Sequence, residues 1–78
     1  MITYLKNQKD LAETIKHVID SYWNNEQSEI DMEKQIITLV DRNREKVFEE
    51  QEYKSVIRQR LGKRRLLLMN KILGIKPN

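Results

Sequence analysis

The chain has 78 residues, of which 38% are hydrophobic and 35% charged, with two glycines, one proline and no cysteine. This length supports a single domain, over residues 1–78, around a modest core, and the lack of cysteine excludes disulfides, thiolate metal sites and cysteine nucleophiles. The net charge of +3 conceals an asymmetry: residues 1–52 carry seven Lys/Arg and twelve Asp/Glu, whereas residues 53–78 carry eight Lys/Arg and no acid. No apolar run approaches the roughly 20 residues of a transmembrane helix, and we expect a soluble, cytoplasmic protein without a membrane partner.

The spacing of apolar residues predicts a first helix over about residues 7–24. They recur at intervals of three and four, which at about 100° per residue places them on one arc of roughly 140°. Asn7 is suitably placed to cap the helix, and Asp10 lies in its first turn, where a carboxylate is favourable. The arc contains Tyr4, Leu5, Leu11, Ala12, Ile15, Val18, Ile19, Tyr22 and Trp23.

A second helix is predicted over residues 29–43. Ser28 is followed three residues later by Asp31, which is close to a capping box, and Asn43 can take a left-handed conformation at the end of the helix. The apolar residues cover about half the circumference of this helix, so it should touch two neighbours. They are Ile30, Met32, Ile36, Ile37, Leu39 and Val40.

A third helix is predicted over residues 51–73. Val47 and Phe48 precede it and should plug the core from a short turn, while the acidic segment 49–52 suits the first turn of a helix. Gly62 leaves two alternatives open, a continuous or kinked helix, or a break that gives a fourth short helix. With Gly74 as a stop signal, the predicted fold is all-α, a compact three-helix domain.

Beyond Gly62 the apolar residues point nearly all round the helix, which indicates burial on every side. The first two helices of so small a chain can cover only part of this surface. The remainder is therefore a candidate interface for a homo-oligomer, with a central position in the monomer as the alternative. The predicted interface residues are Leu66, Leu67, Met69 and Leu73.

The basic residues of the last third flank this apolar surface and permit two interpretations. In the first, they form salt bridges to the neighbouring helices, and their long stems cover apolar surface. The candidate acidic partners are Asp10, Glu13, Asp20, Glu29, Glu33 and Asp41.

In the second interpretation the basic segment 58–65 binds nucleic-acid phosphates without reading the base sequence. The candidate residues are Arg58, Arg60, Lys63, Arg64 and Arg65. A helix-turn-helix template with Gly62 in the turn fits poorly, because Lys63 and Lys71 would occupy apolar positions. The aromatic residues belong to the first helix, so the sequence predicts no stacking platform beside these cations.

Catalytic and cofactor chemistry find little support in the sequence. His17, the single histidine, points away from the apolar arc and is expected to be a solvated surface residue. Glu29 and Glu33 could hold a hard cation, although this spacing is ordinary on a helix surface. Trp23 should lie at the rim of the core with its N–H bonded to a partner, with a binding hot spot as the alternative. We expect no enzyme activity, cofactor, metal or small-molecule substrate.

Five short motifs are spread over most of the chain: Lys6-Asn7-Gln8, Leu11-Ala12, the segment 20–26 (DSYWNNE), the segment 62–66 (GKRRL) and Lys71-Ile72-Leu73. With these motifs the chain resembles a family of small, uncharacterised, all-helical proteins of low-GC Gram-positive bacteria. The resemblance implies a bacterial, cytoplasmic helical domain. The family has no established activity, so the resemblance implies no site.

Two functions follow as hypotheses. The first is a non-enzymatic interaction module that self-associates through its C-terminal helix, with its acidic and basic parts neutralising each other within or between chains. The alternative is a small nucleic-acid-binding or regulatory protein that contacts phosphates through the basic segment 58–65.

Overall fold

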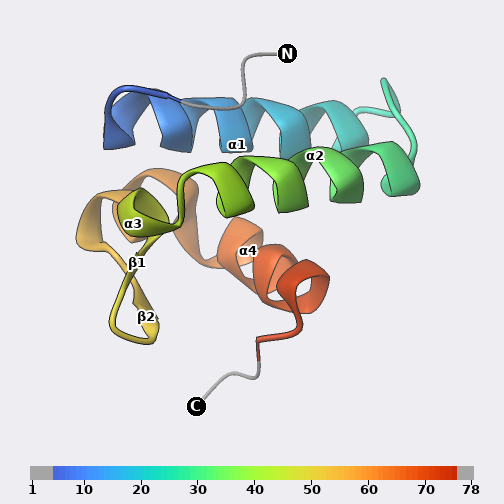
Figure 1. Cartoon of the computed structure of the whole chain (residues 1–78). Helices are drawn as coiled ribbons and strands as arrows, with labels where there is room; N and C mark the ends of the chain where they lie inside the picture. The colour runs from blue at the N-terminus through green and yellow to red at the C-terminus, as the bar shows by residue number, and fades with distance from the viewer. Residues whose placement is uncertain (1–4, 76–78) are drawn as a thin grey trace.

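The structure is a computed structural model and describes residues 5–75. Three long helices dominate it, which confirms the all-α class and the three-helix domain (Figure 1). The elements are α1 (Gln8–Trp23), α2 (Glu29–Arg42), the single turn α3 (Arg44–Val47), β1 (Phe48–Glu49), β2 (Glu52–Tyr53) and α4 (Ser55–Leu73). Within the described range, no helix is long and apolar enough to cross a bilayer.

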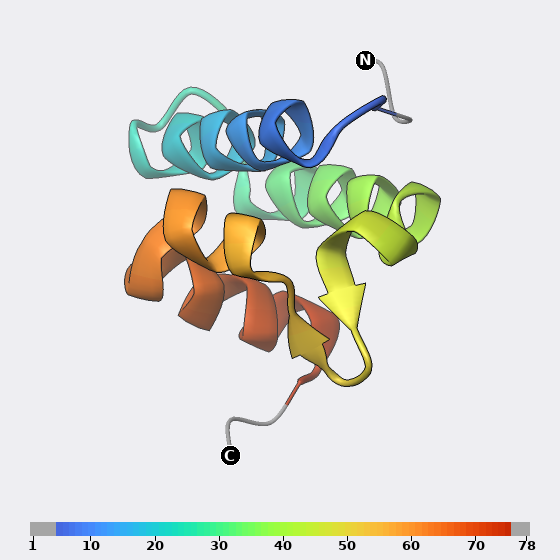
Figure 2. The ribbon, with the colours of Figure 1, turned by 90° about the vertical axis from the view of Figure 1, so that its left-hand side faces the viewer.

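Helices α1 and α2 lie side by side and run in opposite directions, and α4 packs on one side of this pair (Figure 2). The contact of α4 is most extensive with α1. Thirteen buried apolar side chains form the core between the three helices. They are Leu11, Ala12, Ile15, Val18, Ile19, Met32, Ile36, Leu39, Val40, Val47, Ile57, Leu61 and Met69.

Both predicted N-caps are present. The Asn7 Oδ1 atom accepts a hydrogen bond from the backbone N–H of Asp10 at 2.8 Å. The Ser28 Oγ atom accepts one from the backbone N–H of Asp31 at 3.1 Å. Each bond satisfies one of the free N–H groups in the first turn of a helix, so the short polar side chains determine where α1 and α2 begin.

Asn43 ends α2 differently from the prediction. Its φ of −137° is not left-handed, and its side chain is fully buried. The Nδ2 group donates to the Leu39 carbonyl at 2.8 Å, and Oδ1 accepts from the backbone N–H of Leu5 at 3.2 Å. The side chain thus ties the segment before α1 to the end of α2. Asn43 makes this long-range bond to Leu5 instead of taking the left-handed conformation that the sequence predicted.

The predicted start of the third helix at residue 51 is wrong, because residues 48–53 form a small antiparallel hairpin. Val47 is fully buried, and the rings of Phe48 and Tyr53 stack at 5.2 Å between centroids. The predicted role of Val47 and Phe48 as a core plug is therefore confirmed. The carboxylates of this segment lie on the exposed tip of the hairpin instead of the first turn of a helix.

Gly62 divides α4 into two helical halves. Its φ of 79° and ψ of 168° lie outside the helical region, so a continuous helix is wrong: two helical segments meet at a kink at Gly62, and the break that the sequence allowed lies at this residue. A side chain at this position would meet no atom within 4 Å, so the backbone conformation, and not the available space, calls for glycine. Gly74, with a φ of 71°, ends the helix in the left-handed conformation expected of a stop signal.

Candidate nucleic-acid interface

Arg65 is the best-satisfied basic residue of α4. Its Nε and Nη2 groups donate to Asp20 Oδ1 at 3.0 and 2.8 Å, and Nη2 also reaches Oδ2 at 3.0 Å. Its Nη1 group donates to the Leu61 carbonyl at 3.0 Å, one of the last carbonyls before the kink. Arg65 therefore joins α4 to α1 and stabilises the end of the first half of α4, as the salt-bridge interpretation predicted.

Arg60 makes a second bridge to α1, with Nη1 at 3.3 Å from Glu13 Oε1. Its side chain is 40% exposed and that of Glu13 49%, so this bridge contributes little to stability. The other four predicted partners make no bridge to α4 within residues 5–75. Asp10 accepts from Asn7, Glu29 accepts from the Tyr22 hydroxyl, and Asp41 pairs with Arg44. Glu33 makes no ion pair with a described residue.

Three cations on the second half of α4 form what we term the cationic stripe: Lys63, Arg64 and Lys71. Lys63 and Lys71 are eight residues apart on one helix face, and Arg64 lies beside them. All three side chains are exposed. In the described part of the chain no carboxylate lies within 4 Å of any of them. Leu67, with an exposed fraction of 51%, lies between them.

Arg58 lies apart from the cationic stripe, on the first half of α4. It is exposed, and its Nη2 group is 3.5 Å from Ser55 Oγ. Of the five residues predicted to bind nucleic acid, Arg60 and Arg65 are thus paired with acids of α1. Arg58, Lys63 and Arg64 have no ion pair with a described residue.

The fold brings Trp23 to the cationic stripe, which the sequence did not predict. The guanidinium carbon of Arg64 is 5.1 Å from the centre of the indole ring, and that of Arg65 is 5.6 Å away. Both distances lie within the range of a cation–π contact. Trp23 is 38% exposed, and its indole N–H donates to no described residue, so the predicted N–H partner is not found there. An available signal was the position of Trp23 three residues after Asp20, on the same helix face.

The four residues of the predicted oligomer interface do not share one surface. Met69 is fully buried in the core of the single chain, which agrees with the alternative of a central position in the monomer. Leu66 and Leu73 are half-buried and pack against the same core. Leu67 alone of the four is mainly exposed. The kink at Gly62 explains the difference, because it turns one side of the second half of α4 into the core.

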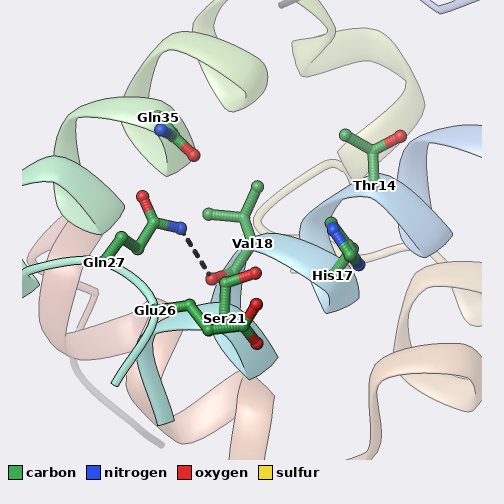
Figure 3. A pocket seen from close by; sticks show the side chains of 7 residues that line it. All are labelled: Thr14, His17, Val18, Ser21, Glu26, Gln27 and Gln35. Carbon is green, nitrogen blue, oxygen red and sulfur yellow. Dashed lines mark hydrogen bonds between the residues drawn. The ribbon is translucent and has the colours of Figure 1, made fainter. Parts of the chain in front are cut away.

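A second surface feature lies away from the cationic stripe, around His17. His17 is exposed, as predicted, and lines a shallow recess of about 420 Å³ between α1, the segment after it and α2 (Figure 3). Gln27 closes one side of the recess, where its Nε2 group donates to the Val18 carbonyl at 3.1 Å. No group of three or more His, Asp or Glu side chains among residues 5–75 is arranged to hold a metal ion.

The pKa values of two tyrosine hydroxyls are raised above the ordinary value. Burial raises the pKa of Tyr53 to about 12, and its hydroxyl donates to Asn70 Oδ1 at 2.7 Å. The negative charge of Glu29 raises the pKa of Tyr22, whose hydroxyl donates to this carboxylate at 3.3 Å. Both hydroxyls are thus hydrogen-bonded to side chains of other elements or segments of the fold.

A family model described as a conserved hypothetical protein, CLB_0814_fam, matches residues 2–74. The chain belongs to this family. The CLB_0814_fam match covers all four helices, the hairpin and the cationic stripe, and it confirms the resemblance to an uncharacterised family over most of the chain. No curated protein and no solved structure matches the chain.

Proposed function

We propose that this protein is a non-enzymatic binding module, and that its cationic stripe binds the phosphate backbone of nucleic acid. The observation that carries the proposal is the contrast between two groups of cations on one helix. Arg60 and Arg65 are paired with carboxylates of α1, whereas the three stripe residues have no such partner among the described residues. Lys and Arg side chains left exposed on one face are the usual electrostatic footprint of phosphate contacts.

A symmetric dimer through the same face is disfavoured by its charge. In such a dimer identical patches meet, so the three cations around Leu67 would oppose the same three cations of a second copy. Like charges in a desolvated interface oppose association. A polyanion meets the same surface without this cost.

Self-association through a different geometry is the second candidate, and one observation favours it. Ile30 on α2 is 65% exposed and lies among exposed carboxylates, which include Glu29 and Asp31. This acidic apolar patch complements Leu67 and the cationic stripe, so two copies could meet head to tail. Sedimentation of the wild type and of Leu67→Glu tests this candidate. A monomeric wild type rules it out, and a larger species that Leu67→Glu dissociates supports it.

Fluorescence anisotropy with generic DNA and RNA oligonucleotides at low salt tests the nucleic-acid proposal. The key variant is Lys63→Gln/Arg64→Gln/Lys71→Gln. Its matched control is Lys9→Gln/Lys34→Gln/Arg42→Gln, which removes the same charge from exposed residues of α1 and α2. We expect the stripe variant to lose binding while the control retains most of it. Absence of binding by the wild type at low salt would exclude the proposal.

A further inference from the structure

We infer that the ligand of this surface is single-stranded nucleic acid, because Trp23 and Arg64 form a stacking site for an unpaired base beside the cationic stripe. This inference rests on the proposed function and adds the class of strand that is bound. Its basis is the contact between α1 and α4 that places the guanidinium of Arg64 5.1 Å from the ring centre of Trp23.

Trp23 is placed to receive a planar ligand. It is the last residue of α1, and its exposed fraction is 38%, although an indole ring is among the most favourable groups to bury. A base that is free to leave its own strand can stack on such a ring, and this contact tolerates every base because each has a π-face. The bases of a duplex are already stacked and do not offer this face.

The two arginines at the ring differ in their freedom to move. Arg65 is held by the carboxylate of Asp20 and by the Leu61 carbonyl. The guanidinium of Arg64 makes no hydrogen bond or ion pair with any residue in the range 5–75, and it contacts the Trp23 ring through a cation–π interaction. The guanidinium of Arg64 can therefore move to a phosphate when a base takes its place over the ring, without the loss of any bond that holds the fold.

The cationic stripe contacts the phosphate backbone of the same nucleic-acid strand. Lys63 and Lys71 are separated by two turns of helix, about 12 Å at 1.5 Å per residue, and a single strand laid along this span carries more than one phosphate. A strand along the stripe thus passes phosphates near both lysines. A base at the Lys63 end of this path reaches Trp23, because the guanidinium of Arg64 at that end of the stripe lies 5.1 Å from the centre of the indole ring.

The fluorescence of Trp23, the single tryptophan of the chain, provides a direct test. Oligothymidylate and oligouridylate of about 20 nucleotides and a duplex of the same length are titrated into the protein at low salt. We expect both single strands to quench the indole fluorescence and the duplex to leave it nearly unchanged. A difference between the DNA and RNA strands shows which of them the site prefers.

Two substitutions at Trp23 separate stacking from burial. Trp23→Phe keeps an aromatic face, whereas Trp23→Leu keeps an apolar side chain without one. Anisotropy should show that Trp23→Leu weakens single-strand binding by about 5- to 100-fold and leaves duplex binding as it is, while Trp23→Phe retains most of the preference. Circular dichroism and thermal unfolding establish that both variants fold.

Two results would overturn the inference, and they differ in what they imply for the proposed function. Equal binding of single strands and duplex, lost in the stripe variant but insensitive to Trp23→Leu, refutes base stacking and leaves phosphate binding intact. Absence of binding to every oligonucleotide refutes both.

Discussion

Arg65 and Asp20 form the tightest side-chain link between the first and last helices, with the guanidinium Nη2 atom at 2.8 and 3.0 Å from the two carboxylate oxygens. The link uses one acid from the acidic part of the chain and one cation from the basic part. It neutralises part of the charge asymmetry inside the molecule. It also holds the backbone of Arg64, the residue just before Arg65 in α4, close to Trp23.

The first prediction concerns this ion pair. Arg65→Lys should lower the free energy of unfolding by about 1 to 2 kcal/mol, because an ammonium group cannot bridge both Asp20 oxygens and the Leu61 carbonyl together. Urea unfolding measures this loss. Arg60→Lys is the matched control, and its effect should stay within about 0.5 kcal/mol because that bridge is exposed. Equal losses in the two variants would show that the Asp20 contact has no special weight.

The second prediction concerns the kink. Gly62→Ala should lower the free energy of unfolding by about 1 to 3 kcal/mol, because a φ of 79° with a ψ of 168° is essentially restricted to glycine. In a regular helix the same substitution would increase stability by about 1 kcal/mol. The sign of the change, measured by urea unfolding, therefore decides whether α4 is kinked in solution. A stabilised Gly62→Ala variant would contradict the structure.

The third prediction concerns the buried amide of Asn43. Asn43→Ala should cost about 2 to 3 kcal/mol, because it leaves the Leu39 carbonyl and the Leu5 N–H without the partners that the side chain provides. Thermal unfolding measures the loss, and Ser28→Ala, which removes a solvent-exposed cap, serves for comparison at about 1 kcal/mol. An Asn43→Ala variant no less stable than Ser28→Ala would show that the buried bonds matter no more than a surface cap.

The fourth prediction concerns pH. The pKa of Tyr53 is raised to about 12 by burial, so folding favours its neutral hydroxyl over the phenolate. The corresponding stability is complete below the tyrosine pKa of the unfolded chain, about 10, and is lost as the pH rises from there through 12. Tyrosinate absorbance and urea unfolding should both show this window. Tyr53→Phe should reduce the loss, and a pH dependence as steep in Tyr53→Phe as in the wild type would refute this cause.

Local features of the fold could be predicted from the sequence, and long-range ones could not. The caps at Asn7 and Ser28 depend on residues three positions away, so the sequence contains the complete information. The hairpin at 48–53 has strands of two residues each, too short for an alternating pattern. Its formation depends on the packing of Val47 and Phe48 against helices distant in the sequence.

For the candidate site, the sequence likewise predicted individual charged residues but not the contacts between distant parts of the chain. The exposed cations Lys63 and Arg64 were identified from composition and position, and Asp20 was named among the acids that bridge to α4. The contact of Trp23 with Arg64 was missed, because it joins residues 41 positions apart and requires the packing of α4 on α1. For Met69 the sequence left a buried position and an interface position open, and the choice between them depends on how α4 packs on the other helices.

The dependence of nucleic-acid binding on salt tests the central claim most directly. For the three phosphate contacts of the cationic stripe, the logarithm of the binding constant of a single strand should fall against the logarithm of salt concentration with a slope of about −2. The slope should approach zero for Lys63→Gln/Arg64→Gln/Lys71→Gln and remain near −2 for Lys9→Gln/Lys34→Gln/Arg42→Gln. Equal slopes for the two triple variants would contradict the assignment of phosphate binding to the cationic stripe.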